Sequence, residues 1–429
     1  MSGQASPGPG GRSILLISYF FPPTRDTGAQ RPAAMAKYLA RLGHRVTVLT
    51  TKAFGDGDAG PGLENIEVIR ADDLQAVRAR RAGHERVDSL FDSDTYSGKP
   101  HPLSYAIHPE PLRVAWGPFA RRAALAAHRR AGFEAVISTS PPETAHLIGR
   151  ALQRRGVPWV ADVRDAWTFE PLRPHFPLGA QRKLDERMER RLLGAADRVV
   201  CVSEPAAADL RERGIADPAV IANAWDPDGE PGPEAVAAAA GLLEADRTSI
   251  LYTGRFGSYG RDPKPLADAI GRLNSTKPEA AAKLEIAIAG PLREDEKALF
   301  ESVAAGPVKL TLLGSLERER SLALQRSADA LLLLAQPTRS QLVNFKLFEY
   351  LAAARPILAL CAGTEAGRIL GEAGSPVVAA DDPGAIAASL AAAAELTPPD
   401  PALAQRYSYP AAAEAMAAVT EAAIASKRA

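Results

Sequence analysis

Short apolar runs alternate with longer amphipathic stretches along the whole chain. The stretch of residues 29–43 has apolar positions at helical spacing, and it separates two short runs that are rich in β-branched side chains. Short runs without regular alternation of apolar and polar positions are typical of strands covered on both faces, as in a parallel sheet between helices. In the first half of the chain, such runs cover residues 13–18, 45–50, 65–70, 134–139, 158–163 and 197–203.

A second series of runs follows at residues 249–254, 283–290, 308–314, 328–335, 355–361 and 375–380. The segment between the two series, 226–246, is rich in Pro, Gly, Ala and acidic side chains, which indicates a linker. We therefore expect two doubly wound, Rossmann-like α/β domains, residues 1–225 and 247–405. Residues 406–429 are expected to form a C-terminal helix that can pack back on the first domain. Such domains bind ligands at the carboxyl ends of their parallel strands.

Composition narrows the class of protein. The 429 residues include 46% hydrophobic and 24% charged side chains, the balance of an ordinary soluble protein. Lys and Arg together number 51, as do Asp and Glu, and this neutrality argues against a nucleic-acid-binding protein. Cys201 and Cys361 lie in separate apolar runs, which favours buried thiols over a disulfide or a metal site. Because neither a signal peptide nor a membrane-spanning run is visible, we expect a cytoplasmic protein.

Polar residues follow two strands of the first half. Thr27 and Gly28 open a helix after the first strand, and a helix N-terminus can bind an anion, although a plain turn explains them equally well. Asp162, Arg164 and Asp165 alternate in charge after the fifth strand. Charges at such a position are costly unless they are paired or bound to a ligand, so either a site or a structural ion pair is expected here.

Cations gather after the first strand of the second half. Gly254 and Arg255 directly follow this strand, and Arg261 and Lys264 come within the next ten residues. Three cations at a turn between a strand and a helix suit a diphosphate, which arginine binds in a fork and lysine as a point charge. A solvated basic turn is the alternative interpretation.

The stretch "NFKLFEYLAAARPILAL" combines an expected helix with two charges in an apolar setting. Asn344 is a good N-cap, Phe345 follows it, and Lys346 falls in the first turn, where the helix dipole disfavours a cation. A bound anion would account for that lysine. Glu349 can accept two hydrogen bonds from a ribose diol, or it can pair with Lys346 three residues earlier.

The opening "SYFFPPTRDTGAQRPAAMAKYLARLGHRVTVLTT" resembles the start of family 4 retaining glycosyltransferases. The stretches "ISTSPPETAHLIGRAL", "PWVADVRDAW", "VVCVSE", "YTGRFG", "LTLLGSLERE", "ADALLLL" and "KLFEYLAAARPILAL" then follow in the order of that family. The resemblance covers nearly the whole chain. It implies the GT-B fold, in which two Rossmann-like domains face each other across a cleft.

Within the donor half, the resemblance implies roles for several residues. Arg255 matches the arginine on the donor diphosphate, and Gly260 stands where the family has a companion lysine, so that Arg261 or Lys264 must substitute. Of the two carboxylates in the family's E-x7-E motif, Glu349 matches the one on the ribose, whereas Gln341 replaces the one near the donor sugar. Asn344 matches a glycine that approaches the phosphates.

Within the acceptor half, Thr27 and Gly28 match a glycine pair near the reaction centre, and Arg164 replaces a histidine that many relatives carry. Asp165 and Asp162 are candidates, together with the leaving phosphate, for taking the acceptor proton. The residues that we assign to acceptor binding are Asp26, Ser140 and Asp162.

The implied activity is transfer of a sugar from a UDP- or GDP-type sugar nucleotide to a lipid carrier, a glycan or a small metabolite. The resemblance further implies retention of the anomeric configuration and no requirement for a metal or cofactor. Gln341 disfavours a covalent intermediate on that residue and leaves a front-face path. The departures also leave open a catalytically silent protein of the same fold that binds a sugar nucleotide or supports a partner enzyme. An epimerase of the same fold is disfavoured, because the sequence offers few carboxylates and histidines for its cleft.

The first half is also basic. Residues 12–224 contain 31 Lys and Arg against 25 Asp and Glu, a net charge of +6. The segment 112–131 carries five arginines together with Trp116 and Phe119. Such a segment can lie on an anionic membrane surface, or it can be a helix with a solvated basic face. We therefore expect either peripheral membrane contact or an ordinary protein surface.

Overall fold

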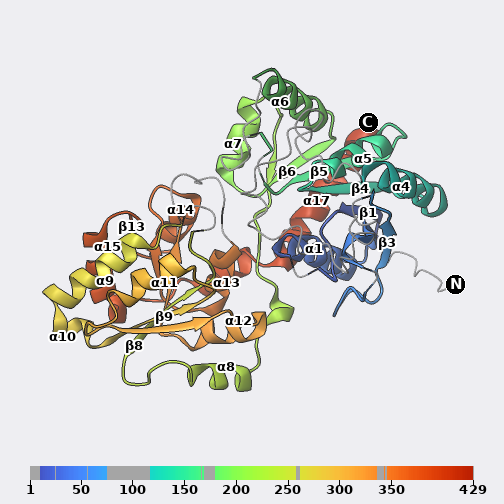
Figure 1. Cartoon of the computed structure of the whole chain (residues 1–429). Coiled ribbons are helices and arrows are strands. Elements are labelled where there is room, and N and C mark those ends of the chain that lie inside the picture. The colour runs from blue at the N-terminus through green and yellow to red at the C-terminus, as the bar shows by residue number, and fades with distance from the viewer. Residues whose placement is uncertain are drawn as a thin grey trace. The chain divides into compact units, whose positions relative to one another are not determined.

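The computed structural model describes residues 10–24, 26–55, 57–74, 116–165, 167–168, 179–257, 261–335, 343 and 345–428. The chain divides into two compact units (Figure 1). Unit 1 comprises Met1–Ala222 and Tyr409–Ala429, and unit 2 comprises Asn223–Ser408. Each unit is an α/β structure, as the sequence pattern predicts.

In the described part of unit 1, seven strands form one parallel sheet in the order β3-β2-β1-β4-β5-β6-β7. The strands are β1 (Ser13–Ser18), β2 (Arg45–Thr51), β3 (Glu67–Ala71), β4 (Ala135–Ser140), β5 (Trp159–Val163), β6 (Arg198–Cys201) and β7 (Ala219–Val220). The helices are η1 (Thr27–Ala29), α1 (Gln30–Arg41), η2 (Lys52–Phe54), α4 (Gly117–Ala131), α5 (Thr144–Gln153), α6 (Gly179–Leu193), α7 (Glu204–Glu212) and α17 (Tyr409–Arg428). Every residue of β1, β4 and β5 is buried, which explains why these strands lack alternating polar positions.

In unit 2, the described strands form a second parallel sheet in the order β10-β9-β8-β11-β12-β13. They are β8 (Thr248–Thr253), β9 (Leu284–Ala289), β10 (Lys309–Gly314), β11 (Ala330–Leu334), β12 (Ile357–Leu360) and β13 (Val377–Val378). The helices are η5 (Pro227–Gly229), α8 (Pro233–Ala240), α9 (Lys264–Thr276), α10 (Pro278–Ala281), α11 (Glu294–Glu301), α12 (Arg318–Ser327), α13 (Phe345–Ala353), α14 (Glu365–Glu372), α15 (Pro383–Ala391), η8 (Ala393–Glu395) and α16 (Pro401–Arg406).

The segment 226–246, expected to be a linker, contains η5 and α8 and belongs to unit 2. Helix α8 packs against α12, where the Ser327 hydroxyl donates to the carbonyl oxygen of Val236 over 2.8 Å. An ion pair between Glu230 and Arg326, 2.8 Å long, adds a second tie. The alanines of this segment therefore serve helix packing rather than flexibility.

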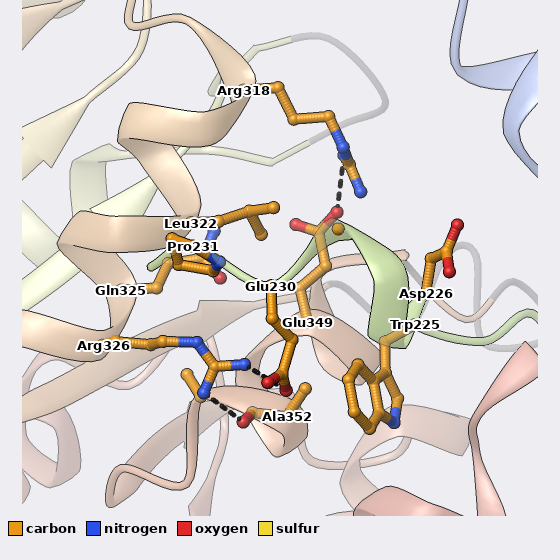
Figure 2. Close-up of a pocket in the computed structure, with 12 residues that line it drawn as sticks. Trp225, Asp226, Glu230, Pro231, Arg318, Leu322, Gln325, Arg326, Glu349 and Ala352 are labelled. Carbon is orange, nitrogen blue, oxygen red and sulfur yellow. Dashed lines mark hydrogen bonds and ion pairs between the residues drawn. The ribbon is translucent and has the colours of Figure 1, made fainter. Parts of the chain in front are cut away.

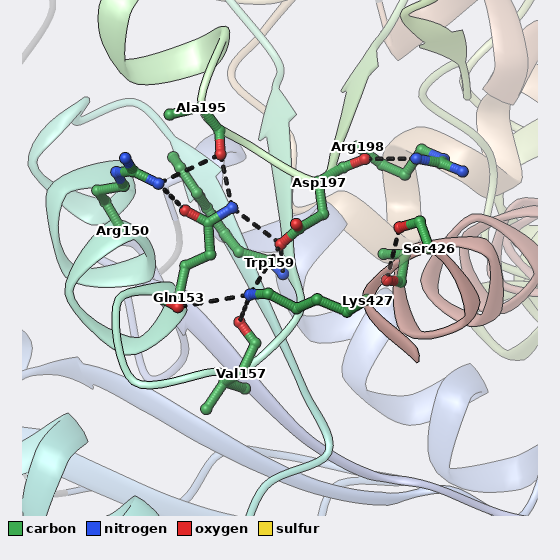
Figure 3. A network of polar contacts seen from close by, with 10 residues as sticks. Arg150, Gln153, Val157, Trp159, Ala195, Asp197, Arg198, Ser426 and Lys427 are labelled. Atoms are coloured by element: carbon green, nitrogen blue, oxygen red, sulfur yellow. Dashed lines mark hydrogen bonds and ion pairs between the residues drawn. The ribbon is translucent and has the colours of Figure 1, made fainter. Parts of the chain in front are cut away.

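The C-terminal helix α17 lies on unit 1, where it packs against α1 and β5. Figure 3 shows its last turn, in which the Lys427 ammonium donates to the carbonyl oxygen of Val157 over 3.1 Å and lies 3.4 Å from a carboxylate oxygen of Asp197. The same Asp197 oxygen accepts from the backbone N–H of Trp159 over 2.8 Å. The end of the chain is thus tied to the first residue of β5.

In both sheets, the strand order reverses beside the first strand, between β1 and β4 in unit 1 and between β8 and β11 in unit 2. Loops that leave such neighbouring strands run in opposite directions and open a crevice at the carboxyl edge of the sheet. Residues after these four strands are therefore the first to be considered for a site. Among the described helices, none combines the length and the apolar character that crossing a bilayer requires.

Candidate functional site

In unit 2, the carboxyl end of β8 meets the start of α13. Gly254 directly follows β8 and has a φ of +102°, which residues with a side chain rarely adopt. A Cβ atom on Gly254 would lie 1.9 Å from Nζ of Lys346. The lysine head group therefore lies against the backbone at the end of β8, in space that only glycine leaves open.

The Lys346 ammonium is held in a setting that disfavours its charge. Burial lowers its pKa to about 7, and the nearby Arg261 guanidinium acts in the same direction, while Glu349 opposes them. Nζ also lies 4.9 Å from the ring centroid of Tyr252. Two cations thus come together at the N-terminus of α13, where the helix dipole favours an anion.

Tyr252 organises the loop that carries Arg261. Its hydroxyl donates to the carbonyl oxygen of Arg255 over 2.8 Å, and the Gly257 N–H donates to the carbonyl oxygen of Arg261 over 2.8 Å. Burial raises the pKa of Tyr252 to about 12, with Arg261 opposing. The Arg255 side chain is exposed.

Lys264, unlike Arg261, lies at an exposed position and forms an ion pair within its own helix. It begins α9 with its side chain 63% exposed, and its Nζ pairs with Asp268 one helical turn further on at 2.5 Å. Of the two cations expected to replace the family's lysine, Arg261 is therefore the one that the structure brings to Lys346.

Helix α13 is fixed to the end of β8 by Tyr350. Its hydroxyl accepts from the Thr253 N–H over 3.0 Å and lies 3.1 Å from the Thr253 hydroxyl. Glu349, beside it, pairs with Arg318, the first residue of α12, at 2.8 Å (Figure 2). The partner of Glu349 is therefore Arg318, and not Lys346 as the alternative interpretation of the sequence had it.

The Arg318–Glu349 pair borders a pocket that is open to solvent and lies between α12, α13 and the start of unit 2. Phe345, the first residue of α13, is partly buried. Gln341, Asn344 and Gly260 lie outside the described residues.

In unit 1, Arg164 connects the end of β4 with η1, the short helix that follows β1. Its Nε donates to the carbonyl oxygen of Ser140 over 2.8 Å, and its Nη1 donates to that of Gly28 over 2.5 Å. Burial lowers the pKa of Arg164, while Asp165 opposes the shift. Among the described residues, its Nη2 is buried without a hydrogen-bond partner. Arg164 thus occupies the switch point of this sheet.

Next to it, Asp26 caps η1 by accepting from the Gly28 N–H over 2.6 Å, and Thr27 is exposed. Asp162 has a different environment, because it is 2% exposed and both of its oxygens are engaged. Arg31, which is fully buried, donates to these oxygens over 2.9 and 3.1 Å, and the Thr139 hydroxyl donates to one of them over 2.9 Å. This arrangement favours a structural role for Asp162 over acceptor binding.

Arg31 was not singled out in the sequence, although it is the one charged residue in the first turn of the helical stretch 29–43. Its burial depends on Asp162, which lies far along the chain, so only the folded sheet brings the pair together. Arg318 was missed for the same reason.

The aromatic residues around α4 differ from the expectation for a membrane-facing segment. Trp116 is fully buried and packs edge-on against Tyr19, with ring centroids 5.3 Å apart, so it is not an interfacial aromatic. Phe119 is 36% exposed. The exposed arginines of this helix are Arg121, Arg122, Arg129 and Arg130. Residues 112–115 lie outside the described part of the chain.

In the described ranges, no group of three or more His, Cys, Asp or Glu side chains could hold a metal ion.

Two parallel-sheet units, each with polar residues at its switch point, define the architecture: the chain has the GT-B fold. Residues 27–224, which lie within unit 1, match the family model described as the glycosyl transferase 4-like domain. No curated protein sequence matches the chain. The resemblance inferred from the sequence is confirmed for the domain and the fold.

Solved structures resemble the chain over nearly its full length. Sucrose-phosphate synthase from Thermosynechococcus elongatus is 17% identical, with a TM-score of 0.62 and coverage of 97% of this chain and 100% of that one. HepE of Anabaena, solved with UDP, is 14% identical, with a TM-score of 0.61 and coverage of 95% and 99%. A UDP-forming α,α-trehalose-phosphate synthase from Burkholderia vietnamiensis is 15% identical, with a TM-score of 0.59 and coverage of 97% and 100%. At these identities the similarity concerns the fold.

Proposed function

We propose that the chain transfers a sugar from a nucleoside diphosphate sugar to an acceptor hydroxyl or amine. The observation that carries the proposal is the position of Lys346, whose Nζ lies against Gly254 at the end of β8, beside Arg261. Keeping this lysine charged costs free energy in the unliganded protein, because burial and a second cation both disfavour the charge. A bound diphosphate would bring negative charge to both cations, which supports a phosphate site at the N-terminus of α13.

In the proposed reaction, the bond between the anomeric carbon and the diphosphate oxygen breaks, and its electron pair leaves with the diphosphate. Lys346, Arg261 and the exposed Arg255 would stabilise the charge that develops there. These cations would have the role that Mg²⁺ has in metal-dependent transferases, so we expect turnover without a metal or cofactor. The acceptor oxygen or nitrogen bonds to the anomeric carbon, and its proton passes to the leaving phosphate or to the exposed Asp165.

Two finer points belong to the same proposal. The first is retention of the anomeric configuration, which the resemblance to family 4 implies. We propose a front-face path, because Gln341 stands where a nucleophilic carboxylate would be needed for a covalent intermediate. The second is a donor of the UDP or GDP type. HepE was solved with UDP and with UDP-glucose, and the trehalose-phosphate synthase is described as UDP-forming, so UDP is tested first.

For the acceptor, we propose a binding site in unit 1 at Arg164, Asp26 and Ser140. Lipid carriers, glycans and small metabolites are the classes to be tested, in the cytoplasm or at the inner face of the membrane. One neighbour was solved with glucose 6-phosphate, which makes sugar phosphates a practical first choice.

The test is incubation with a panel of UDP- and GDP-sugars, with and without acceptors, while the release of the nucleoside diphosphate is measured. We expect slow hydrolysis of one donor and faster turnover with its acceptor, and product NMR reports the anomeric configuration. Arg255→Ala should reduce turnover by a factor of about 10²–10³, the loss expected for one preorganised charge contact. The control is Lys297→Met, which removes a surface lysine paired with Glu301 in α11. Nucleotide binding without any turnover would instead favour the silent protein.

A further inference from the structure

We propose that Arg318 positions the carboxylate of Glu349 and thereby sets the preference of the nucleotide site for ribose over deoxyribose. The inference rests on the proposed function, in which Glu349 holds the ribose diol. It assigns a role to a residue of α12 that the sequence patterns did not indicate.

The geometry places one carboxylate between two cations. Glu349 Oε1 lies 2.8 Å from Nη1 of Arg318, and the Glu349 side chain is 12% exposed whereas that of Arg318 is 52% exposed (Figure 2). Lys346, three residues earlier on α13, is within electrostatic reach of the same carboxylate, because Glu349 raises its pKa. Residues three apart on a helix face each other, so Lys346 and Glu349 could pair directly. The ion pair that forms is the one with Arg318.

Because Glu349 pairs with Arg318, Glu349 and Lys346 can each contact a different part of the nucleotide. Arg318 binds Oε1 from the neighbouring helix, and the other oxygen of Glu349 retains its lone pairs for a diol. A planar guanidinium fixes the orientation of a carboxylate better than an ammonium does. Lys346 meanwhile remains against Gly254, where the proposed diphosphate binds. Without Arg318, we expect Glu349 to turn toward Lys346, which would weaken both contacts with the nucleotide.

A second effect of Arg318 is on the strength of the ribose contact. Hydrogen bonds to a carboxylate are about twice as strong as neutral ones, so the ribose contact depends strongly on how Arg318 orients the Glu349 side chain. The loss of one such bond corresponds to a decrease in affinity of roughly 10- to 100-fold. Arg318 itself is not expected to touch the reacting atoms, so it is a positioning residue.

The test compares UDP with 2′-deoxy-UDP by isothermal titration calorimetry on the full chain, with GDP and 2′-deoxy-GDP as a second pair. The variants are Arg318→Met, Glu349→Gln and the combination of both, and the control is Arg320→Met, two residues further on the same helix and also exposed. Arg318 lies in the first turn of α12, where a cation is unfavourable, so Arg318→Met should fold.

We expect the wild type to prefer the ribonucleotide by roughly 10- to 100-fold, and Arg318→Met and Glu349→Gln each to reduce that ratio to about threefold or less. The double variant should lose no more than either single variant, and Arg320→Met should match the wild type. If Arg318→Met keeps the wild-type preference for the ribonucleotide while Glu349→Gln loses it, Arg318 does not position Glu349, although Glu349 still binds the ribose. If both variants keep the ratio, Glu349 does not hold the ribose. A wild type that binds neither UDP nor GDP overturns the proposed function itself.

Discussion

Protonation of Lys346 should be coupled to nucleotide binding, and this coupling can be measured. With a pKa of about 7, the lysine is only about one-tenth protonated at pH 8 in the free protein. A diphosphate against Nζ favours the charged form, so the pKa should rise toward the ordinary value of lysine, 10.5. If it passes about 9, binding at pH 8 takes up about 0.8 proton, because the diphosphate itself is already fully ionised there.

The assay is titration calorimetry at pH 8 in buffers with different ionisation enthalpies, since the dependence of the observed enthalpy on the buffer gives the number of protons taken up. The wild type should also lose about tenfold in affinity between pH 7 and pH 8.5, because an increasing share of the binding energy goes into protonating Lys346. Lys346→Met should bind more weakly, without proton uptake and with an affinity that no longer changes over this range.

Two results would refute this reasoning. Proton uptake below about 0.2 in the wild type at pH 8 would mean that Lys346 is already charged in the free protein, or that the diphosphate binds elsewhere. Equal proton uptake in Lys346→Met would assign the titration to another group.

Three further predictions concern stability and surfaces. Arg31→Met should lower the free energy of unfolding by about 3–5 kcal/mol in urea titrations, because Asp162 is left buried without its partner. Combining it with Asp162→Leu should recover part of that loss. If the double variant loses as much stability as Arg31→Met alone, the unpaired Asp162 charge is not the cause. Gly254→Ala should cost about 1–3 kcal/mol because of its positive φ, whereas Gly271→Ala, in the middle of α9, should be neutral or stabilising. The wild type should co-sediment with anionic vesicles at low salt, and replacing Phe119 should reduce the bound fraction. If the wild type stays in solution, the basic face of α4 is an ordinary solvated surface.

The strands were predictable because a strand buried on both faces is a short, continuous run of apolar residues in the sequence. The run at residues 13–18 matches β1, and the run at 249–254 matches β8 to within a residue. Strand β7, with two residues, is too short to produce such a pattern. Helix α8 was missed because it has only eight residues and is flanked by Pro and Gly, although its four consecutive alanines favour a helix.

The sequence could predict site residues only where a role follows from the position of the residue within its own helix or strand. A lysine in the first turn of a helix is unfavourable, so the sequence alone indicates that Lys346 has an anionic ligand or partner. Its contact with Gly254 and the ion pair between Glu349 and Arg318 join separate segments, and no local pattern contains them. Trp116 was misjudged because the sequence places it beside arginines, while the fold turns its ring toward Tyr19.

The division of the chain has a consequence for its synthesis. Because unit 2 comprises Asn223–Ser408, the ribosome makes all of it after the sheet of unit 1 and before α17. At about 5–20 residues per second, that interval lasts roughly 10–40 s. During this time β5 and α1 lack the helix that later covers them, and Asp197 lacks Lys427. A nascent chain therefore carries an incomplete first unit, in which α1 and β5 still lack the helix that packs on them, while the second unit can already fold.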